Sequence, residues 1–361
     1  MDLDFEQMLR RALEEAVRER GHVNILIAGR TGVGKSTLIN AVFQGDFATT
    51  GQGRPVTQHT REIQKPGCPL TIFDTRGLEI DAFDEVLSSL ETLVRHRCSE
   101  LDPNKHIHVA WVCVQEDGRR VETAETRLHD MLSRHVPVVG VITKARSDGG
   151  FRAEVQQLLP HARNVVRVRA LAETFDDGHE LPPFGLEELV EITFQLVPDG
   201  HKRAFVAAQK ASLAKKKSSS QAVIMGAAAT AAVAAASPIP FSDAFVLVPI
   251  QVGMLAGISA TFGLELSTAF LATLVSAAIG SAGATVAGRA IVTGLLKLVP
   301  GAGTVAGSLI GAATASALTV TMGEAYVLTL AKLYDEGAGK TPSTSAISAA
   351  FAALMEKRRA A

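Results

Sequence analysis

The stretch "HVNILIAGRTGVGKSTLINAVF", His22–Phe43, decides the fold of the first half of this chain. An apolar run, "HVNILIAG", leads directly into a glycine-rich loop, and the helical pattern "LINAVF" follows that loop. A strand, a loop of the form G-x-x-x-x-G-K-[ST] and a helix, in this order, predict a phosphate-binding P-loop. We therefore expect an α/β P-loop NTPase domain with a nucleotide site at this loop.

Each residue type in the loop suits a phosphate ligand. Glycines let backbone N–H groups curl around a β-phosphate without clashes from Cβ atoms. We expect Lys35 to bridge the β- and γ-phosphates and the Ser36 hydroxyl to bind Mg²⁺. Thr37 begins the helix whose positive end faces the anion. The expected nucleotide-binding residues here are Gly29, Arg30, Thr31, Gly32, Val33, Gly34, Lys35, Ser36 and Thr37.

A second apolar strand, "PLTIFDTRG", carries Asp74, and Gly77 follows three residues later. We expect Asp74 to hold Mg²⁺ through water and the Gly77 amide to contact the γ-phosphate. In the polar segment before this strand, Thr57 of "PVT" is expected to close over Mg²⁺ and the γ-phosphate, with Thr60 as second candidate. The predicted catalytic residues are Lys35, Thr57 and Gly77, and the predicted metal ligands are Ser36, Thr57 and Asp74.

Three more apolar runs follow, "HIHVAWVCV", "VPVVGVIT" and "NVVRVRAL". They alternate with helical segments around residues 121–135, 151–159 and 186–197, which predicts a mostly parallel sheet covered by helices on both faces. Ligands bind at the carboxyl ends of such strands. The P-loop, Asp74, Thr143 and Ala170 all fall at those ends.

The motifs "GRTGVGKST", "PVT", "DTRG" and "TKARSD", in this order, resemble the Era-like and septin-like GTPases of the TrmE-Era-EngA-septin class, over roughly residues 21–196. The resemblance implies GTP and GDP as ligands, Mg²⁺ as cofactor and GTPase activity. It also implies that the loop "VRALAE" offers the backbone amide of Ala170 or Leu171 to the guanine carbonyl, although the usual Ser is absent. The segments "IPFSDAFVLVPIQVGMLAGISATFGL" and "LLKLVPGAGTVAGSLIGAATASALTVTMGEAY" resemble the YcjF-type hydrophobic domain, whose role is undefined.

The chain departs from this family pattern near the phosphates. Leu78 follows Gly77 where Ras-like proteins carry a water-orienting Gln, so we expect slow hydrolysis or help from a partner. Gly32 stands where potassium-activated relatives carry Asn, so no potassium activation is expected. Arg30 and Arg76 could act as arginine fingers, in cis or across a dimer, or could be solvated surface residues.

The stretch "VITKARSD" departs from the pattern at the base. Guanine readers of this class carry Asn or Thr, then Lys, any residue and Asp; Thr143 and Lys144 fit, but Arg146 occupies the acid's slot. An arginine has only donors and cannot accept hydrogen bonds from guanine. We favour a shifted motif in which Asp148, in a wider loop, reads guanine. The alternative is a site that has lost its base specificity.

The composition changes near Lys217, because charged residues fall from about a quarter of the chain to about a tenth. Four uncharged runs follow, at about residues 218–242, 244–264, 266–288 and 298–323, each long enough to cross a bilayer. The basic "KASLAKKK" before the first run fits a cytoplasmic flank. The alternative is a soluble bundle of Ala-rich helices, because Asp243 and Glu265 would be costly inside a bilayer. Small residues recur at four-residue spacing, as in membrane helix pairs, at Gly280, Ala284, Gly288, Gly303, Gly307, Gly311 and Ala315.

A chain of 361 residues with three scattered cysteines and a net charge of -1 predicts two domains in a reducing cytosol and no basic field for nucleic acid. We expect an all-α, Ala/Gly-rich second domain after the α/β domain, and an N-terminal helix docked on the flank of the α/β domain. The expected organisation is an amphipathic helix (1–20), a GTP-binding domain (21–198), a basic linker helix (199–217), a hydrophobic, membrane-associated helical domain (218–336) and a polar linker with an amphipathic helix (337–361).

The leading functional hypothesis is a GTP-driven switch or assembly device with slow hydrolysis. Its G domain would be cytoplasmic, would form a homodimer, and would be coupled to lipid or a partner in the bacterial inner membrane through residues 218–336. No DNA or RNA partner is expected. The alternatives are a ribosome- or RNA-assembly GTPase of the Era type and a non-hydrolysing tether that uses nucleotide as a structural ligand.

Overall fold

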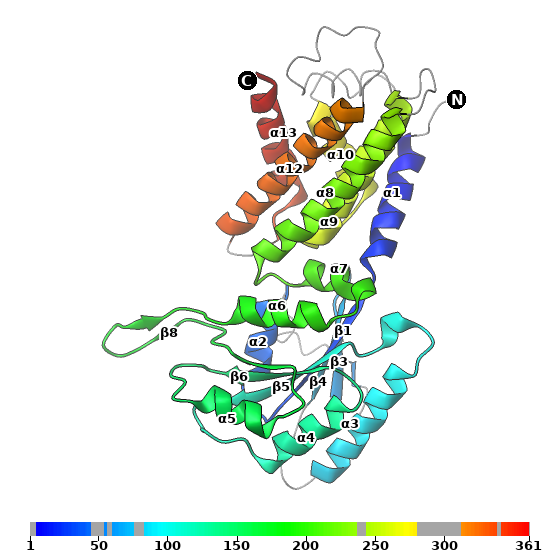
Figure 1. Ribbon diagram of the computed structural model, residues 1–361. Coiled ribbons are helices and arrows are strands. Elements are labelled where there is room, and N and C mark those ends of the chain that lie inside the picture. Colours follow the sequence, from blue (N-terminus) through cyan, green and yellow to red (C-terminus); the bar gives the residue numbers. More distant parts are fainter. Residues whose placement is uncertain are drawn as a thin grey trace. The chain divides into compact units, whose positions relative to one another are not determined.

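The structure is a computed structural model whose chain divides into two compact units (Figure 1). One unit is Gly21–Ser212, which we call the α/β unit. The other, which we call the helical unit, combines Met1–Arg20 with Leu213–Ala361. The structure describes residues 5–44, 54–55, 60–75, 83–236, 243–279, 312–337 and 341–360.

The described strands of the α/β unit form a seven-stranded sheet in the order β2-β3-β4-β1-β5-β6-β7. Strands β4, β1, β5, β6 and β7 are parallel, whereas β3 is antiparallel to β4 and β2 to β3. A separate antiparallel hairpin joins β8 and β9. The predicted, mostly parallel sheet is confirmed. The strands are β1 (Val23–Ala28), β2 (Arg54–Pro55), β3 (Thr60–Gln64), β4 (Leu70–Thr75), β5 (Val109–Gln115), β6 (Val138–Thr143), β7 (Asn164–Arg167), β8 (Glu173–Thr174) and β9 (Glu180–Leu181).

Helices cover both faces of this sheet, as the continuous apolar strands predicted. Successive residues of β1 point to opposite faces, so Ile25 and Ile27 join one core while Leu26 and Ala28 join the other. The first core includes α2, α6 and α7, and the second includes α3, α4 and α5. Their bounds are α2 (Lys35–Val42), α3 (Phe83–Cys98), α4 (Thr123–Ser133), α5 (Phe151–Leu158), α6 (Leu186–Leu196) and α7 (Asp199–Ala208), and a short 3-10 helix, η2 (Pro103–Lys105), precedes β5.

Trp111 of β5, the chain's one tryptophan, anchors the first core. Its ring stacks on Phe43 at the end of α2, with 5.7 Å between centroids and 14° between planes. Its indole N–H donates to the Thr193 hydroxyl of α6 at 3.1 Å. The helix that follows the glycine loop is therefore fixed to the sheet and to a second helix by one side chain.

Helix α1 (Phe5–Arg20) belongs to the helical unit. Met8 and Leu9 on its buried face lie in the same core as Leu255 and Leu271. This placement differs from the expectation that the N-terminal helix docks on the flank of the α/β domain. The reason is physical: an amphipathic period defines an apolar face but does not identify the surface that covers it.

The expected linker helix over residues 199–217 is divided between the two units. Helix α7 buries Ala204 and Phe205 in the first core of the α/β unit. The next helix begins at Leu213 and belongs to the helical unit. Lys202 and Arg203 of this stretch lie on α7, whereas Lys215, Lys216 and Lys217 lie on the next helix, where Lys216 is buried.

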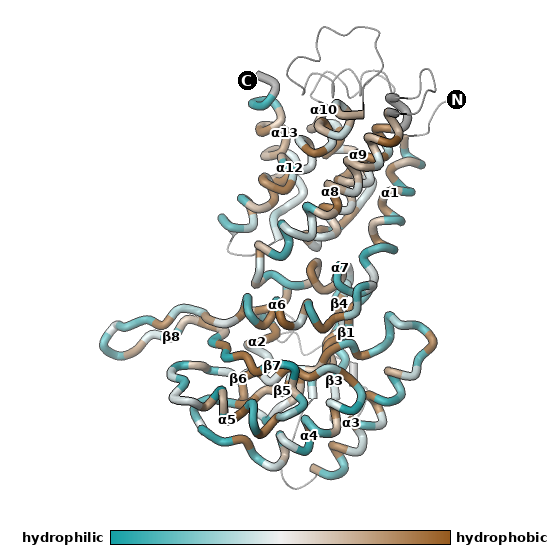
Figure 2. Tube along the Cα trace, in the orientation of Figure 1, coloured by the Kyte–Doolittle hydropathy of each residue, from teal (hydrophilic) through white to brown (hydrophobic). Residues whose placement is uncertain are grey.

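The helical unit is built from long, apolar helices (Figure 2). Hydroxyl contacts in its described core include two between residues far apart in the sequence: Ser259 Oγ lies 2.7 Å from Tyr326 Oη, and the Tyr334 hydroxyl donates to the Phe262 carbonyl at 2.6 Å. The remaining described helices are α8 (Leu213–Ala236), α9 (Asp243–Phe262), α10 (Thr268–Ile279), α12 (Ala312–Glu336) and α13 (Thr344–Ala360). The predicted all-α second domain is confirmed.

The predicted bilayer-length runs correspond only in part to long helices. Among the described residues, one helix, over Leu213–Ala235, is long and apolar enough to cross a membrane. The apolar stretches of α9 and α10 are shorter, at Leu247–Phe262 and Thr268–Ala278. In the predicted small-residue stripes, Gly280, Ala284, Gly288, Gly303, Gly307 and Gly311 lie outside the described residues.

The C-terminal segment forms the predicted amphipathic helix. Ile347, Phe351 and Met355 of α13 are spaced four residues apart and lie fully buried in the core of the helical unit. Its apolar face therefore packs against the chain itself.

Candidate nucleotide site

The glycine loop between β1 and α2 has the backbone geometry of a phosphate cradle. Gly29, Gly32 and Gly34 have φ angles of 152°, 78° and 99°, which side chains rarely allow. A Cβ added to Gly29 would lie 2.6 Å from the Cys113 carbonyl oxygen of β5. The loop is thus seated directly on the neighbouring strand, and this close approach requires glycine at its first position.

Lys35 lies over this loop. Its ammonium donates to the carbonyl of Gly29 at 2.7 Å and to that of Arg30 at 3.0 Å. Burial lowers the pKa of Lys35, while the nearby Asp74 carboxylate opposes that shift. A cation held at the loop by two of its carbonyls is placed to contact phosphate oxygens.

The candidate magnesium ligands lie on neighbouring elements. Ser36 and Thr37 are exposed in the first turn of α2. Asp74 lies near the carboxyl end of β4, opposite Ile27 of β1. Thr60, the second threonine candidate, is buried in β3 opposite Thr75.

Several predicted residues near the γ-phosphate fall in the segments that the structure leaves undescribed. These are Thr57, Arg76, Gly77 and Leu78. Their roles stay predictions.

Arg30 is engaged by another side chain. Its guanidinium forms an ion pair with Glu122, the residue that caps α4. To act as an arginine finger, Arg30 would have to leave this partner.

Thr143 and Lys144 lie beside the glycine loop. The Thr143 hydroxyl lies 2.5 Å from the Val33 carbonyl, to which it donates, and 3.2 Å from the Val114 carbonyl. Lys144 adopts a left-handed conformation with φ of 53°, and its Cε lies 4.0 Å from where a Cβ on Gly34 would stand. The structure therefore joins the end of β6 to the phosphate-binding loop.

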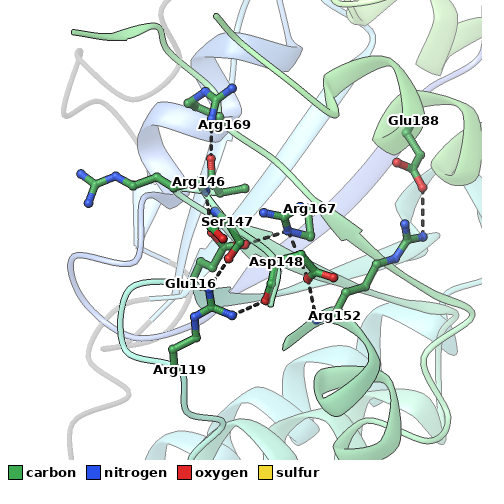
Figure 3. Close-up of polar contacts among 10 residues, drawn as sticks. Glu116, Arg119, Arg146, Ser147, Asp148, Arg152, Arg167, Arg169 and Glu188 are labelled. Atoms are coloured by element: carbon green, nitrogen blue, oxygen red, sulfur yellow. Dashed lines mark hydrogen bonds and ion pairs between the residues drawn. The ribbon is translucent and has the colours of Figure 1, made fainter. Parts of the chain in front are cut away.

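The loop after Lys144 is held by a buried carboxylate that the sequence analysis did not single out (Figure 3). Glu116, 1% exposed at the end of β5, accepts from the backbone N–H groups of Arg146 and Ser147 and from Arg167 Nε at 2.7 Å. Burial raises its pKa, but these hydrogen bonds outweigh that effect, so its pKa lies below the usual range. Glu116 thus supports the loop from beneath as a carboxylate.

Arginines satisfy the carbonyl side of the same loop (Figure 3). Arg119 donates to the carbonyls of Ser147 and Asp148, and Arg169 donates to the Ala145 carbonyl at 2.8 Å. With Glu116 on the N–H side, most of this loop's backbone is paired within the chain. The alternation of arginine with valine in "VVRVRAL" was the available signal for this support.

Asp148 and Arg146 have partners within the protein. One oxygen of the Asp148 carboxylate accepts from the Arg152 N–H at 3.0 Å, in the first turn of α5, and lies 3.4 Å from Arg167 Nε. The Arg146 guanidinium binds both oxygens of Glu173 on β8. The expected role of Asp148, in which its carboxylate faces the base, stays a prediction.

Ala170 and Leu171 follow β7 at the carboxyl edge of the sheet. Ala170 is half-buried and Leu171 is 63% exposed. Their neighbour Arg169 exchanges both backbone hydrogen bonds with Phe184. The loop that would contact the guanine carbonyl is therefore fixed to the segment that follows the β8–β9 hairpin.

Within the described residues, the protein contains no group of three or more His, Cys, Asp or Glu side chains arranged for a metal ion. His108 has a structural position instead. Its Nδ1 accepts from the Asn24 N–H at 2.9 Å and its Nε2 lies 3.1 Å from the Pro103 carbonyl. Burial, reinforced by neighbouring His201, lowers the pKa of His108 to about 4.

Both halves of the chain match known families. Residues 24–144 match the family model described as 50S ribosome-binding GTPase, and residues 201–357 match a domain of unknown function, DUF697. The first half is therefore a P-loop GTPase domain of the Era- and septin-like class, as the motifs predicted, and the second half is the expected hydrophobic domain.

Curated relatives share parts of the α/β unit. The chain is 38% identical over 88 residues to the tRNA modification GTPase MnmE of Cupriavidus metallidurans, covering 23% of this chain and 18% of the relative. It is 27% identical over 183 residues to MnmE of Desulfotalea psychrophila, covering 49% and 35%. It is 26% identical over 170 residues to human Septin-9, covering 40% and 28%. The chain thus spans about a fifth to about a third of the length of these relatives.

Parts of the chain are also similar to solved structures. One is Era in complex with MgGDPNP and nucleotides 1506–1542 of 16S ribosomal RNA, at 17% identity and a TM-score of 0.31, covering 50% of this chain and 58% of that one. Another is Toc33 from Arabidopsis thaliana, at 16% identity and a TM-score of 0.33, covering 58% and 96%.

Proposed function

We propose that this chain binds GTP, hydrolyses it slowly, and acts as a nucleotide-dependent switch or assembly device coupled to its helical unit. The observation that carries the proposal is the glycine cradle, in which Gly29 sits against β5, Lys35 lies over the loop and Thr143 joins the loop to β6. Phosphates and base would then contact one connected set of elements. The match of residues 24–144 to a GTPase family supports this assignment.

Ser36 and Asp74 would hold Mg²⁺, with Thr57 as the proposed third contact. Hydroxyl and carboxylate oxygens are the donors that Mg²⁺ prefers, and Asp74 is close enough to Lys35 to affect its pKa. Bound Mg²⁺ would neutralise charge on the phosphate oxygens. Lys35 would then stabilise the charge that develops on the β- and γ-phosphates.

Slow hydrolysis is expected because Leu78 cannot orient the attacking water. Arg30, the described arginine of the glycine loop, is paired with Glu122. We propose that a second G domain of the same kind supplies the missing contact, so that homodimerisation raises the rate. The partner in this proposal is another copy of the chain.

We propose that the helical unit couples the switch to the bacterial inner membrane from the cytoplasmic side. Helix α8 supports this, because its exposed side chains between Ser218 and Ala235 include no charge. Met225 and Val233 on this face are 55% and 71% exposed. The partner would be lipid or a membrane protein.

Two further candidates each have a supporting observation. The match of residues 24–144 to a family of ribosome-binding GTPases favours a role in ribosome assembly. The absence of a Gln after Gly77 favours a non-hydrolysing tether. Co-sedimentation with ribosomal subunits would support the first, and turnover that stays at background at high protein concentration would support the second.

The first test is GTP binding and turnover by the full chain. Lys35→Ala should weaken GTP binding about 100-fold, because it removes charged hydrogen bonds to two phosphates. Lys202→Ala is the matched control, since Lys202 is paired with Asp199 on α7 and should leave binding unchanged. Equal affinity for GTP in the Lys35→Ala and wild-type proteins would contradict the proposal.

The second test measures GTP turnover at several protein concentrations and so distinguishes a switch from a non-hydrolysing tether. Turnover per molecule should rise with protein concentration if dimerisation supplies the missing contact. Flotation of the full chain with vesicles of bacterial inner-membrane lipids should recover the protein in the lipid fraction. Recovery only in the soluble fraction would remove the membrane part of the proposal and leave the nucleotide part standing.

A further inference from the structure

The base-side loop, Ala145–Gly150, contains one carboxylate, and that carboxylate already has a structural function. Asp148 Oδ1 accepts from the Arg152 N–H at 3.0 Å, which satisfies an otherwise unpaired donor at the start of α5. The same oxygen lies 3.4 Å from Arg167 Nε. Turning Oδ1 toward a base would leave the Arg152 N–H without this acceptor.

Other contacts hold the loop in place around Asp148. Glu116 accepts from two successive backbone N–H groups, and Arg119 donates to the carbonyls of Ser147 and Asp148 (Figure 3). A Cβ added to Gly149 would lie 3.2 Å from Arg119 Nη1, so the guanidinium also packs against the following glycine. These contacts fix the loop backbone, so only rotation of the Asp148 side chain, away from Arg152 and Arg167, could change where its carboxylate points.

The slot that the acid occupies in guanine readers holds Arg146. This guanidinium binds both oxygens of Glu173, lies 3.6 Å from Asp117, and stands 5.9 Å from the centre of the Phe175 ring. Glu173 and Asp117 are therefore both held by Arg146. The Arg146 guanidinium can only donate hydrogen bonds. N1–H and the 2-amino group of guanine also donate, so Arg146 cannot accept a hydrogen bond from either.

We infer that the base site does not read the 2-amino group of guanine, and that Arg146 is the residue that determines this relaxed specificity. The inference rests on the proposed GTP-binding function and refines its ligand class. The site takes 6-oxopurine nucleotides, hypoxanthine as well as guanine. Inosine triphosphate, which lacks only the 2-amino group, is the discriminating probe.

The experiment compares the dissociation constants of GTP and inosine triphosphate for the full chain at one Mg²⁺ concentration. A carboxylate that accepts from the 2-amino group favours GTP by roughly 10- to 100-fold. We expect a ratio below about 10 for the wild-type protein. A ratio of 10 or more would overturn the inference, whereas failure to bind either nucleotide would overturn the proposed function instead.

Three variants test which residue sets the preference between GTP and inosine triphosphate. Arg146→Asp restores an acid in the expected slot and should raise the preference for GTP. Asp148→Asn keeps an acceptor for the Arg152 N–H, and Glu173→Gln releases Arg146; each should leave the ratio of the two constants unchanged. A wild-type preference for GTP that either of these two variants abolishes would identify that acid as a guanine reader and refute the inference.

Discussion

The two units of this protein use polar side chains in opposite ways. In the α/β unit, buried charge lies at the carboxyl edge of the sheet, where the Glu116 carboxylate pairs with Arg167 and supports the loop Ala145–Gly150. In the described core of the helical unit, the polar contacts come mainly from hydroxyls, such as Ser259 with Tyr326. Lys216 is a buried cation there, and it donates to the Phe262 carbonyl at 3.2 Å, at the end of α9. Charge therefore builds a binding loop in one unit and closes a helix end in the other.

Glycine shows the same contrast. In the α/β unit, Gly29 provides a backbone conformation and a close approach to β5. In the helical unit, Gly323 of α12 provides space, because a Cβ there would lie 2.6 Å from Ile224 Cγ1 and 2.9 Å from Met254 Sδ. One unit uses glycine to shape a loop, and the other uses it to bring three helices together.

The largest expected effect tests the role of buried charge in the α/β unit. Glu116→Gln removes the charge that balances Arg167 and should lower the free energy of unfolding by about 3 kcal/mol. It should also weaken GTP binding, since the loop loses its support. Urea unfolding measures the first and titration the second. Glu173→Gln, which breaks an exposed pair, is the control, and an equal loss in both variants would contradict the comparison.

A slightly smaller effect tests close packing in the helical unit. Gly323→Leu should cost up to about 3 kcal/mol, because the added side chain overlaps Ile224 and Met254. Gly226→Leu in α8 is matched to it, since nothing lies within 4 Å of the Cβ position there. Thermal unfolding should separate the two variants. If both were tolerated, the tight contact among α8, α9 and α12 would be incorrect.

Acid should destabilise the α/β unit selectively. All ten histidines of the chain lie within Gly21–Ser212. The pKa of His108 is lowered to about 4, against an ordinary value of 6.5, so the unfolded state takes up the proton first. The stability that His108 contributes is complete above pH 6.5 and is lost as the pH falls toward 4. Between pH 7.5 and pH 5 this loss is about 2 kcal/mol.

The measurement is hydrogen exchange on the full chain, followed peptide by peptide at both pH values. His108→Gln should abolish most of the pH-dependent loss in peptides of the α/β unit. Peptides of the helical unit should be unaffected by this substitution. If hydrogen exchange in the wild-type protein increased at pH 5 as much in the helical unit as in the α/β unit, the expected selective effect of acid would be contradicted.

The smallest expected effect on stability comes from substitutions on the exposed surfaces of the two units, which should differ in lipid binding instead. Val233→Glu on α8 and Leu101→Glu in the α/β unit both replace exposed apolar side chains, so each should change the unfolding free energy by less than about 0.5 kcal/mol. Only Val233→Glu should reduce recovery with lipid vesicles. Equal flotation of the two variants would indicate that α8 does not contact lipid.

Most of the α/β fold could be predicted because each strand is apolar throughout and the glycine loop joins a strand to a helix. The placement of Thr143 beside the P-loop follows from strand order alone. The support of the base-side loop could not be predicted, because Glu116 and Arg167 are 51 residues apart and meet only when β5, β6 and β7 are side by side. The contacts of Asp148 could not be predicted for a related reason: an acid three residues before a helix can also accept a hydrogen bond from a backbone N–H of the first turn.

The helical unit was harder to predict from the sequence. Apolar, Ala-rich segments have the same sequence pattern whether they face lipid or pack against one another. The helical spacing of apolar residues therefore identified segments such as α12 and α13 as helices, but it did not identify the helices that pack against them. The pairing of α1 with α9 and α10 depends on shape, which no local pattern in Phe5–Arg20 encodes.

The burial of Trp111 in the α/β core has a spectroscopic consequence. The chain contains one tryptophan and two tyrosines, and the tyrosines, Tyr326 and Tyr334, are both buried in α12. Each half of the protein therefore carries its own natural chromophore. Indole emission reports on the packing of α2 against β5, whereas phenol absorbance reports on the helices, so a single unlabelled sample can reveal which half responds first when nucleotide is added.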